Sequence, residues 1–210
     1  MMMQTSQVFK GKTFVWGVNL GCGAGGTCYR GYINVDTWRS KYEEGWKQKR
    51  GFVFLIADAT RLPLQDNVLD EVYCSHLLEH FNCNFTSKIL AEWHRVLKPN
   101  GIIKICVPSM DWVVDLWLGN KRWQEYDQAK GMVLKKDGKA VGSHGPIIRN
   151  LYGHIPEDDS QSVGHKYIFD FESLKYYLEG VGFRNVRPAK IHCVVYWSIG
   201  QSEVCVVADK

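Results

Sequence analysis

The sequence has no long apolar run. The longest one, Phe52–Ala57, spans only a few residues, whereas a membrane-spanning helix needs about 20. The opening residues, MMMQTSQVFKGKTF, also lack the apolar stretch of a secretory signal. We therefore expect a protein without a membrane span that stays in the cytoplasm.

Neither basic nor acidic residues are in strong excess. The chain has 26 Lys and Arg against 22 Asp and Glu, a net charge of +4 that is spread along its length. Nucleic-acid binders usually concentrate basic residues in a patch or stripe, so no nucleic-acid partner is indicated. With 210 residues, 45% of them hydrophobic and 23% charged, the composition is typical of one globular domain, residues 1–210.

Paired cysteine motifs are absent too. The seven cysteines are odd in number and include no C-x-x-C, which argues against a disulfide framework and against a ribbon-type zinc site. Cys74, Cys106, Cys193 and Cys205 lie within apolar, strand-like runs. We expect these four to be buried, reduced thiols.

Short β-branched and aromatic runs alternate with helical patterns, which predicts a parallel α/β sheet. Seven runs are expected to be strands: Phe14–Leu20, Tyr32–Val35, Val53–Ala57, Glu71–Cys74, Ile102–Val107, Val186–Val195 and Val204–Ala208. No helix-length segment separates the last two, so we expect them to pair antiparallel at one edge of the sheet.

Three helices are predicted from apolar periodicity and from capping residues. They cover Thr86–Lys98, Trp112 to about Lys130, and a segment that begins after Asp170 and stops at Gly182. The stretch 131–166, rich in Gly, His, Pro and Asp, is too long for a plain connection. Residues 111–168 are therefore expected to form a helical and loop lid.

Glycines cluster directly after the first predicted strand, in NLGCGAGG at 19–26. Glycine lets the backbone turn sharply and approach a ligand closely. Gly21, Gly23 and Gly26 fit the dinucleotide pattern G-x-G-x-x-G, but that site also needs a helix that holds the pyrophosphate. Asp36 follows too soon for such a helix. The pattern therefore favours a nucleoside ligand without a diphosphate.

Polar residues follow several predicted strands. Asp36 ends the second strand, Asp58 follows the third, and Ser75 follows the fourth. Ligands of open parallel sheets bind at the carboxyl ends of the strands. There Asp36 can accept both ribose hydroxyls, and Asp58 can accept from an adenine amino group. Either aspartate alone could simply cap a helix, but the two together with the glycines favour a nucleoside pocket.

These motifs resemble those of class I S-adenosylmethionine-dependent methyltransferases of the type 11 branch. NLGCGAGG resembles their cofactor loop, and INVD resembles their strand-two acidic motif. ADATRLPLQDNVLDEVYCSHLLEHF and LAEWHRVLKPNGIIKICVP resemble the later segments. The resemblance implies a Rossmann-like α/β fold: a seven-stranded, mostly parallel sheet with an antiparallel edge strand, helices on both faces, and a lid after strand five.

The resemblance also implies S-adenosylmethionine as the cofactor. The glycine loop would face its methionine part, Asp36 its ribose, and Asp58 its adenine. Leu62 would pack on the adenine ring, and the backbone of Ser75 would lie near the methionine ammonium. The implied cofactor-binding residues are Asn19, Gly21, Cys22, Gly23, Asp36, Asp58, Ala59, Leu62 and Ser75. Asn19 departs from the acidic residue common in the class, and a neutral amide holds an ammonium more weakly.

Histidines supply the candidates for catalysis. His144, His154 and His165 lie in the predicted lid, and histidine suits proton removal near neutrality, although each could equally be an exposed loop residue. The segment His76–His80 matches the H-x-x-E-H pattern of inverted zinc peptidases. Because it directly follows a strand, inside the methyltransferase-like run, we expect it to be structural or to line the site, with no metal.

The acceptor is constrained only by missing motifs. No N-P-P-Y-type tetrapeptide follows strand four and no P-C-Q-type motif is present, which disfavours methylation of amides, adenine and the cytosine carbon. We expect in-line methyl transfer to a small-molecule acceptor or to a glycan-linked one, the latter by analogy with related proteins of sugar and cell-surface biosynthesis. Two alternatives stay open: a non-catalytic adenosylmethionine-binding module or partner subunit, and an NAD(P) oxidoreductase.

Overall fold

The structure is a computed structural model, which describes residues 17–23, 28–37, 51–118, 135–136, 139–140, 151–152, 164–191 and 203–210. For 135–136 and 139–140 it describes the backbone alone.

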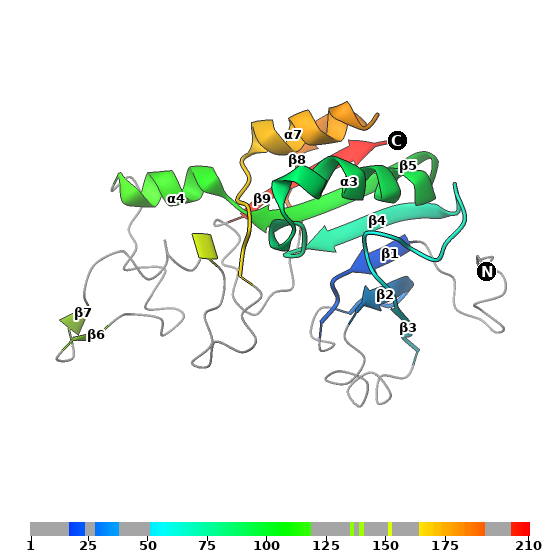
Figure 1. Cartoon of the computed structure of the whole chain (residues 1–210), viewed down its shortest axis with the longest axis horizontal. Coiled ribbons are helices and arrows are strands. Elements are labelled where there is room, and N and C mark those ends of the chain that lie inside the picture. Colours follow the sequence, from blue (N-terminus) through cyan, green and yellow to red (C-terminus); the bar gives the residue numbers. More distant parts are fainter. Residues whose placement is uncertain are drawn as a thin grey trace.

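A seven-stranded sheet with the order β3-β2-β1-β4-β5-β9-β8 forms the centre of the fold (Figure 1). Its strands are β1 (Gly17–Leu20), β2 (Tyr32–Asp36), β3 (Val53–Ile56), β4 (Leu69–Ser75), β5 (Leu97–Pro108), β8 (Arg184–Pro188) and β9 (Glu203–Asp209). The first five run parallel, and β9 is antiparallel to both β5 and β8. The predicted mixed sheet and the antiparallel pairing of the last two strands are thereby confirmed. Two short strands, β6 (Lys135–Lys136) and β7 (Lys139–Ala140), pair separately.

The described helices partly match the predicted ones. Helix α3 spans Thr86–Val96 and ends before the predicted Lys98, because Leu97 already pairs with β4. Helix α7 spans Phe171–Gly180. It begins with the predicted Asp170 cap, whose carboxylate accepts a hydrogen bond from the Ser173 amide at 2.7 Å.

The third predicted helix is shorter in the structure. Helix α4 spans Met110–Trp117 with Ser109 as its N-cap and Leu118 as its C-cap. The rest of the predicted helix, beyond residue 118, lies outside the described residues. The same holds for residues 14–16 and 192–195 of the predicted strands.

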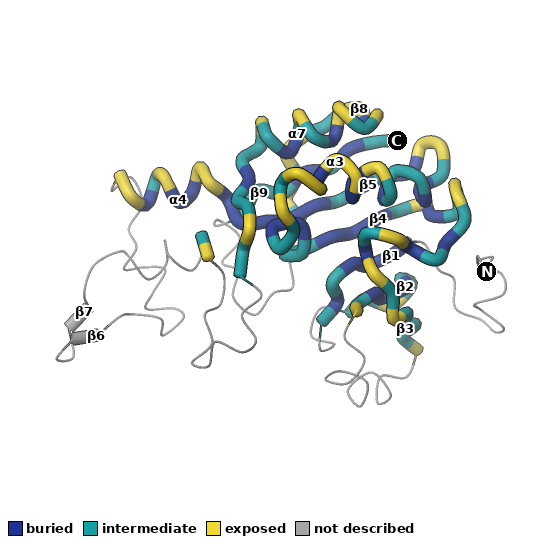
Figure 2. Tube along the Cα trace, in the orientation of Figure 1, coloured by how far each residue is buried: buried dark blue, intermediate teal, exposed yellow. Residues whose placement is uncertain are grey.

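The main core lies between the sheet and helices α3 and α7, which contact each other on one face of the sheet (Figure 1). Strand residues that point to this face, such as Val18, Val72 and Ile105, are fully buried, and the tube in Figure 2 shows the same band of burial. Trp93 of α3 is also fully buried. The expectation of helices on the opposite face falls on segments outside the described residues.

The opposite face of the same strands carries polar side chains. Asn19 of β1 pairs in register with Asn34 of β2 and with Tyr73 of β4, and Tyr73 pairs in turn with Lys104 of β5. Because successive residues of a strand point to opposite faces, these four lie on the face away from α3 and α7. The sheet is therefore amphipathic across its central strands.

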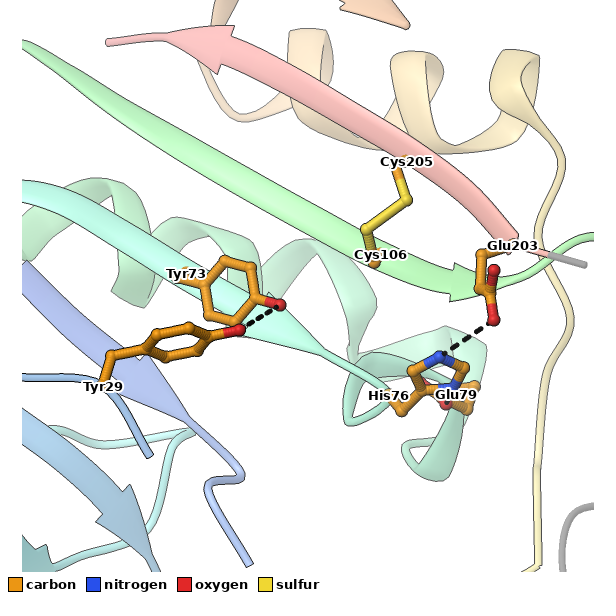
Figure 3. Close-up of a disulfide and its surroundings, with 7 residues drawn as sticks. All are labelled: Tyr29, Tyr73, His76, Glu79, Cys106, Glu203 and Cys205. Carbon is orange, nitrogen blue, oxygen red and sulfur yellow. Dashed lines mark hydrogen bonds and ion pairs between the residues drawn. A yellow bond between two sulfur atoms is a disulfide. The ribbon is translucent and has the colours of Figure 1, made fainter. Parts of the chain in front are cut away.

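The expectation of four reduced cysteines is wrong for two of them. Antiparallel pairing of β5 with β9 sets Cys106 opposite Cys205, with 4.2 Å between their Cα atoms, and the two sulfurs form a disulfide (Figure 3). The apolar surroundings of each cysteine gave no hint of this register, which pairs residues separated by 99 positions. Cys74 is buried as expected and takes no part in this bond. Cys193 lies outside the described residues.

Candidate functional site

The glycine bend after β1 is held by the end of β2. The amides of Gly21 and Cys22 donate to the carbonyl of Val35, at 2.9 and 3.2 Å. The amide of Gly23 donates to the Asp36 carboxylate at 2.9 Å. Gly21 and Gly23 have φ angles of 70° and 57°, a left-handed conformation that favours glycine. Asp36 therefore points at the bend, and its binding of a ribose stays a prediction.

The bend leaves room for a ligand on one side. Among the residues that the structure describes, a Cβ atom on Gly23 would meet nothing within 4 Å, whereas one on Gly21 would meet the side chain of Leu77 at 3.0 Å. At the end of β4 the hydroxyl of Ser75 is buried and has no hydrogen-bond partner among the described residues. Open space at Gly23 and a buried hydroxyl in need of a partner both fit a polar ligand at these strand ends.

The link between the bend and β2 is organised by Asn34, which the sequence analysis missed. Its amide nitrogen donates to the carbonyls of Tyr29, Tyr32 and Val53 at 3.0–3.3 Å, and its oxygen accepts from the Tyr29 amide at 2.9 Å. Asn19 donates to that same oxygen at 2.9 Å. Asn34 therefore fixes a connection too short for a helix. The only available signal was a polar residue inside an apolar strand.

The two predicted cofactor aspartates lie at the ends of neighbouring strands. Asp36 pairs with Ile56 of β3, and its carbonyl accepts from the Ala57 amide at 3.1 Å. Asp58 comes next; its side chain is exposed and accepts from the Thr60 amide at 2.8 Å. The structure thus brings Asp36 and Asp58 to the same edge of the sheet.

Helix α3 supports the loop that follows Asp58. The indole of Trp93 donates to the carbonyl of Ala59 at 2.8 Å, and the amide of Leu62 donates to Glu92 at 2.7 Å. The Leu62 side chain is only 2% exposed and belongs to the main core. Its predicted stacking on an adenine ring stays a prediction, as does the predicted contact of Asn19, whose side chain is 2% exposed.

Cys22, the cysteine of the glycine bend, is fully buried. Hydrogen bonding with Cys28, together with burial, raises the pKa of its thiol. A thiol that resists ionisation is a poor nucleophile. The burial of Cys22 and the raised pKa of its thiol favour a packing role in the bend.

A second group of polar side chains gathers beyond the end of β4. We call His76, Glu79, His80, His165 and Glu203 the histidine–glutamate cluster. His76 lies between two carboxylates: its Nδ1 is 3.4 Å from Glu79 and its Nε2 is 3.6 Å from Glu203 (Figure 3). Nε2 of His165 is 3.9 Å from Glu79, and the rings of His80 and His165 meet edge to face at 5.0 Å.

The backbone explains why these residues converge. His76 has a φ angle of 52°, and such left-handed non-glycine residues occur preferentially at functional sites. A 3₁₀ turn, η1 (Leu78–His80), follows instead of an α-helix, so the helical zinc-peptidase arrangement is not formed. The carbonyl of Glu79 accepts from the amides of Lys166 and Tyr167 at 2.8 and 3.2 Å, which ties the segment around His165 to the cluster.

Burial and charge act together in the cluster. Glu79 is fully buried. Burial by itself disfavours its ionisation, but His76 more than offsets that effect, so the pKa of Glu79 lies below its usual value. Burial likewise disfavours the charged form of His76, yet Glu203 and Glu79 raise the pKa of His76 to about 9. Glu79 is therefore an anion that depends on neighbouring positive charge.

Of the three histidines proposed as general bases, the structure places only His165, within this cluster. Its backbone amide donates to the carbonyl of Tyr152 at 3.1 Å. His144 and His154 lie outside the described residues.

A cavity of about 150 Å³ on the polar face of the sheet is separate from both groups. Its lining includes Tyr32, Glu71 and Lys104. The Tyr32 hydroxyl donates to one oxygen of Glu71 at 2.6 Å, and Lys104 lies 2.7 Å from the other. Burial and Glu71 together raise the pKa of Tyr32. Among the described residues, the polar groups that line this cavity are therefore paired with one another.

Comparisons with known proteins point to methyltransferases. A family model described as a methyltransferase domain matches residues 18–105. Over 51 residues the chain is 45% identical to the ubiquinone/menaquinone biosynthesis C-methyltransferase UbiE of Acidiphilium cryptum. That match covers 24% of this chain and only a fifth (20%) of the curated relative.

The fold of nearly the whole chain resembles that of several solved structures. A SAM-dependent methyltransferase of Methanosarcina mazei has 17% identity and a TM-score of 0.58, and the match covers 95% of this chain and 94% of that one. One from Archaeoglobus fulgidus has 19% identity and a TM-score of 0.55, and the match covers 98% and 89%. At such identities these likenesses establish the fold.

The sheet order and the glycine bend define the class: this is the fold of class I S-adenosylmethionine-dependent methyltransferases. Within the chain, residues 18–105 match the family model described as a methyltransferase domain. Among the residues that the structure describes, no helix has the length and apolarity to traverse a bilayer.

Proposed function

We propose that this protein transfers the methyl group of S-adenosylmethionine to a small-molecule or glycan-linked acceptor. The observation that carries the proposal is the Asp36 carboxylate bound to the amide of Gly23, next to the open space at that glycine. The match of residues 18–105 to a methyltransferase domain supports it.

The proposed cofactor site uses the ends of β1 to β4. Gly21, Cys22 and Gly23 lie along the methionine part, with Ser75 at the ammonium. Asp36 binds the ribose hydroxyls. Asp58 and the Ala59 backbone bind the adenine edge, on a loop that Trp93 holds in place. Asn19 and Leu62 belong to the proposed site through the resemblance alone.

The sulfonium of the cofactor supplies an already activated methyl group. The protein's task is therefore alignment of the acceptor atom with the methyl carbon and the sulfur. Orientation of reacting groups can lower a barrier by about 7–11 kcal/mol. For an acceptor that loses a proton, His165 is the described candidate for receiving it, and its neighbour Glu79 stabilises the resulting positive charge.

The lid, the acceptor and the location of the protein are parts of the proposal. Residues 111–168 would cover the acceptor and exclude water. Within them, Leu151 and Ile168 pack against the buried face of α4, which forms a small second core. A cytoplasmic location stays a prediction. The disulfide of β5 and β9 argues in the other direction, because such bonds persist mainly in oxidising compartments.

Isothermal titration with S-adenosylhomocysteine tests the cofactor site. We expect D36A to abolish binding, because it removes the carboxylate that fixes the bend and holds the ribose. The matched control is D70A, since Asp70 is an exposed residue paired only with Lys98 among its described contacts. Wild-type affinity in D36A would overturn the proposed site.

Turnover measurements test the function. We expect H165A to slow methyl transfer while the protein still binds the cofactor. Production of S-adenosylhomocysteine with a panel of hydroxyl and carboxyl acceptors would establish an enzyme. Tight cofactor binding without turnover on any acceptor would favour a non-catalytic module or partner subunit. Nicotinamide binding without adenosylmethionine affinity would favour an oxidoreductase.

A further inference from the structure

Glu79, His80 and His165 bring three potential metal ligands together. One ligand atom from each residue lies within 4.8 Å of the other two. They come from separate parts of the chain: Glu79 and His80 from the turn after β4, and His165 from the segment that leads into α7. In a tetrahedral site with ligand bonds of about 2.1 Å, ligand atoms lie about 3.4 Å apart. Small rotations of these three side chains would bring their ligand atoms to that separation.

The Glu79 carboxylate is the strongest sign that something is bound. Its side chain is completely buried, and neither oxygen has a hydrogen bond from any part of the chain that the structure describes. A buried carboxylate oxygen without a hydrogen bond is costly to keep away from water, and a metal ion is one partner that removes this cost. Its nearest partners, His76 and His165, lie at 3.4 and 3.9 Å, which is long for a hydrogen bond.

The position of His80 suits a metal ligand. Its Nδ1 lies 3.3 Å from the carbonyl of Gly164, and only a protonated nitrogen makes a favourable contact with a carbonyl. That contact favours the tautomer in which Nε2 keeps its lone pair. Metal-bound histidines are oriented in this way, with the second ring nitrogen donating to a carbonyl or carboxylate.

We propose that Glu79, His80 and His165 bind one divalent first-row transition-metal ion of the zinc type, with at least one coordination position open. Two imidazoles and one carboxylate form a donor set that binds such ions in preference to Mg²⁺ or Ca²⁺. The ion would give the Glu79 carboxylate a direct partner, which neither oxygen has as a hydrogen bond among the described residues. His76 and Glu203 would form an outer layer, since His76 contacts Glu79 on one side and Glu203 on the other.

The site lies just past the carboxyl end of β4, the edge at which acceptors are expected. A metal with an open position binds and polarises an oxygen ligand. This role rests on the proposed methyl transfer, and under it His165 acts as a ligand and not as the proton acceptor. Metal binding itself does not depend on that function.

Titration of the metal-free full chain with Zn²⁺, followed by calorimetry and by elemental analysis after dialysis, tests the site. We expect one equivalent to bind to the wild type. Co²⁺ in place of Zn²⁺ should give the visible absorption of a four- or five-coordinate ion. E79Q and H165N should each weaken binding by about 100-fold or more, since even the loss of an outer partner costs 10- to 100-fold.

Two matched controls separate loss of a ligand from general damage. E172Q changes an exposed glutamate of α7, and H94N changes a histidine that packs on Phe183, away from the cluster; both should bind Zn²⁺ as the wild type does. Thermal unfolding gives a readout independent of activity: Zn²⁺ should raise the Tm of the wild type and leave that of H165N unchanged. If E79Q fails to fold, the Zn²⁺ affinity of H165N alone tests the metal site.

The assignment is overturned if the wild type binds no equivalent of Zn²⁺, or if E79Q and H165N both retain wild-type affinity. Preferential binding of Mg²⁺ would overturn the assigned class of metal. If E79Q and H165N lose metal binding but still bind S-adenosylhomocysteine, the result supports the metal site. Intact metal binding without cofactor affinity would instead reject the proposed function and leave the metal site standing.

Discussion

Replacing Trp93 with phenylalanine tests the support of the loop that follows β3. The Trp93 side chain is fully buried, and its indole nitrogen donates to the Ala59 carbonyl at 2.8 Å. Phenylalanine cannot donate this hydrogen bond and leaves the space of the second ring empty. The Ala59 carbonyl then stays desolvated without this partner.

The expected cost follows from these two losses. An unsatisfied buried polar group costs about 1–3 kcal/mol, and the unfilled volume adds to it, for a total of about 2–4 kcal/mol. With an m-value of about 3 kcal/mol/M or less in urea, the unfolding midpoint should fall by roughly 1 M. Because the loop carries Asp58, affinity for S-adenosylhomocysteine should fall as well.

Urea unfolding followed by circular dichroism measures the effect, and W117F is the matched control. Trp117 is 65% exposed, so the same substitution there should change stability by no more than about 0.5 kcal/mol. The reasoning is refuted if W93F is as stable as the wild type, or if W117F costs as much as W93F.

Three further predictions concern stability. D170A removes the carboxylate that accepts from Ser173 and should cost about 1 kcal/mol. The hydrogen bond with Ser173 lowers the pKa of Asp170 in the folded state. The carboxylate should therefore contribute its full stabilisation at pH 6 and lose it as the pH falls below about 4. Denaturation of the wild type and D170A at pH 6 and at pH 3 checks the sign. G17A places a Cβ against the backbone of β4 and should destabilise by about 1–3 kcal/mol, whereas equal midpoints in urea would contradict that contact. Reduction of Cys106–Cys205, which closes a loop of 99 positions, should cost about 2–5 kcal/mol, and C106S should then be insensitive to reductant.

Local patterns in the sequence were sufficient for most of the regular elements. The apolar stripe of Ile89, Leu90 and Trp93 predicted α3, and Asp170 predicted the start of α7, because side-chain periodicity and capping act over a few residues. The glycine bend and Asp36 were predicted to belong to one pocket, and a hydrogen bond between Gly23 and Asp36 brings them together. These features depend on neighbours within about 20 residues.

The ends of helices and the contacts between strands were harder to predict from the sequence. The end of α3 was misplaced by two residues, because pairing of Leu97 with Leu69 of β4 overrides the helical pattern. Asn34 gave no distinct signal, although it makes the hydrogen bonds that replace a helix between β1 and β2. Leu97 contacts a residue of another strand, and Asn34 likewise bonds to Asn19 of β1 and Val53 of β3.

The sequence by itself determined the class of this protein: a mostly parallel sheet, a glycine bend, and acidic residues at strand ends, all set by short-range backbone and side-chain preferences. Only the tertiary structure decided that Cys106 bonds to Cys205, through the antiparallel register of β5 and β9. It also decided that Glu79 is buried beside His165, 86 positions away in the chain. Burial and proximity of this kind arise when distant segments share one core, and no local pattern encodes them.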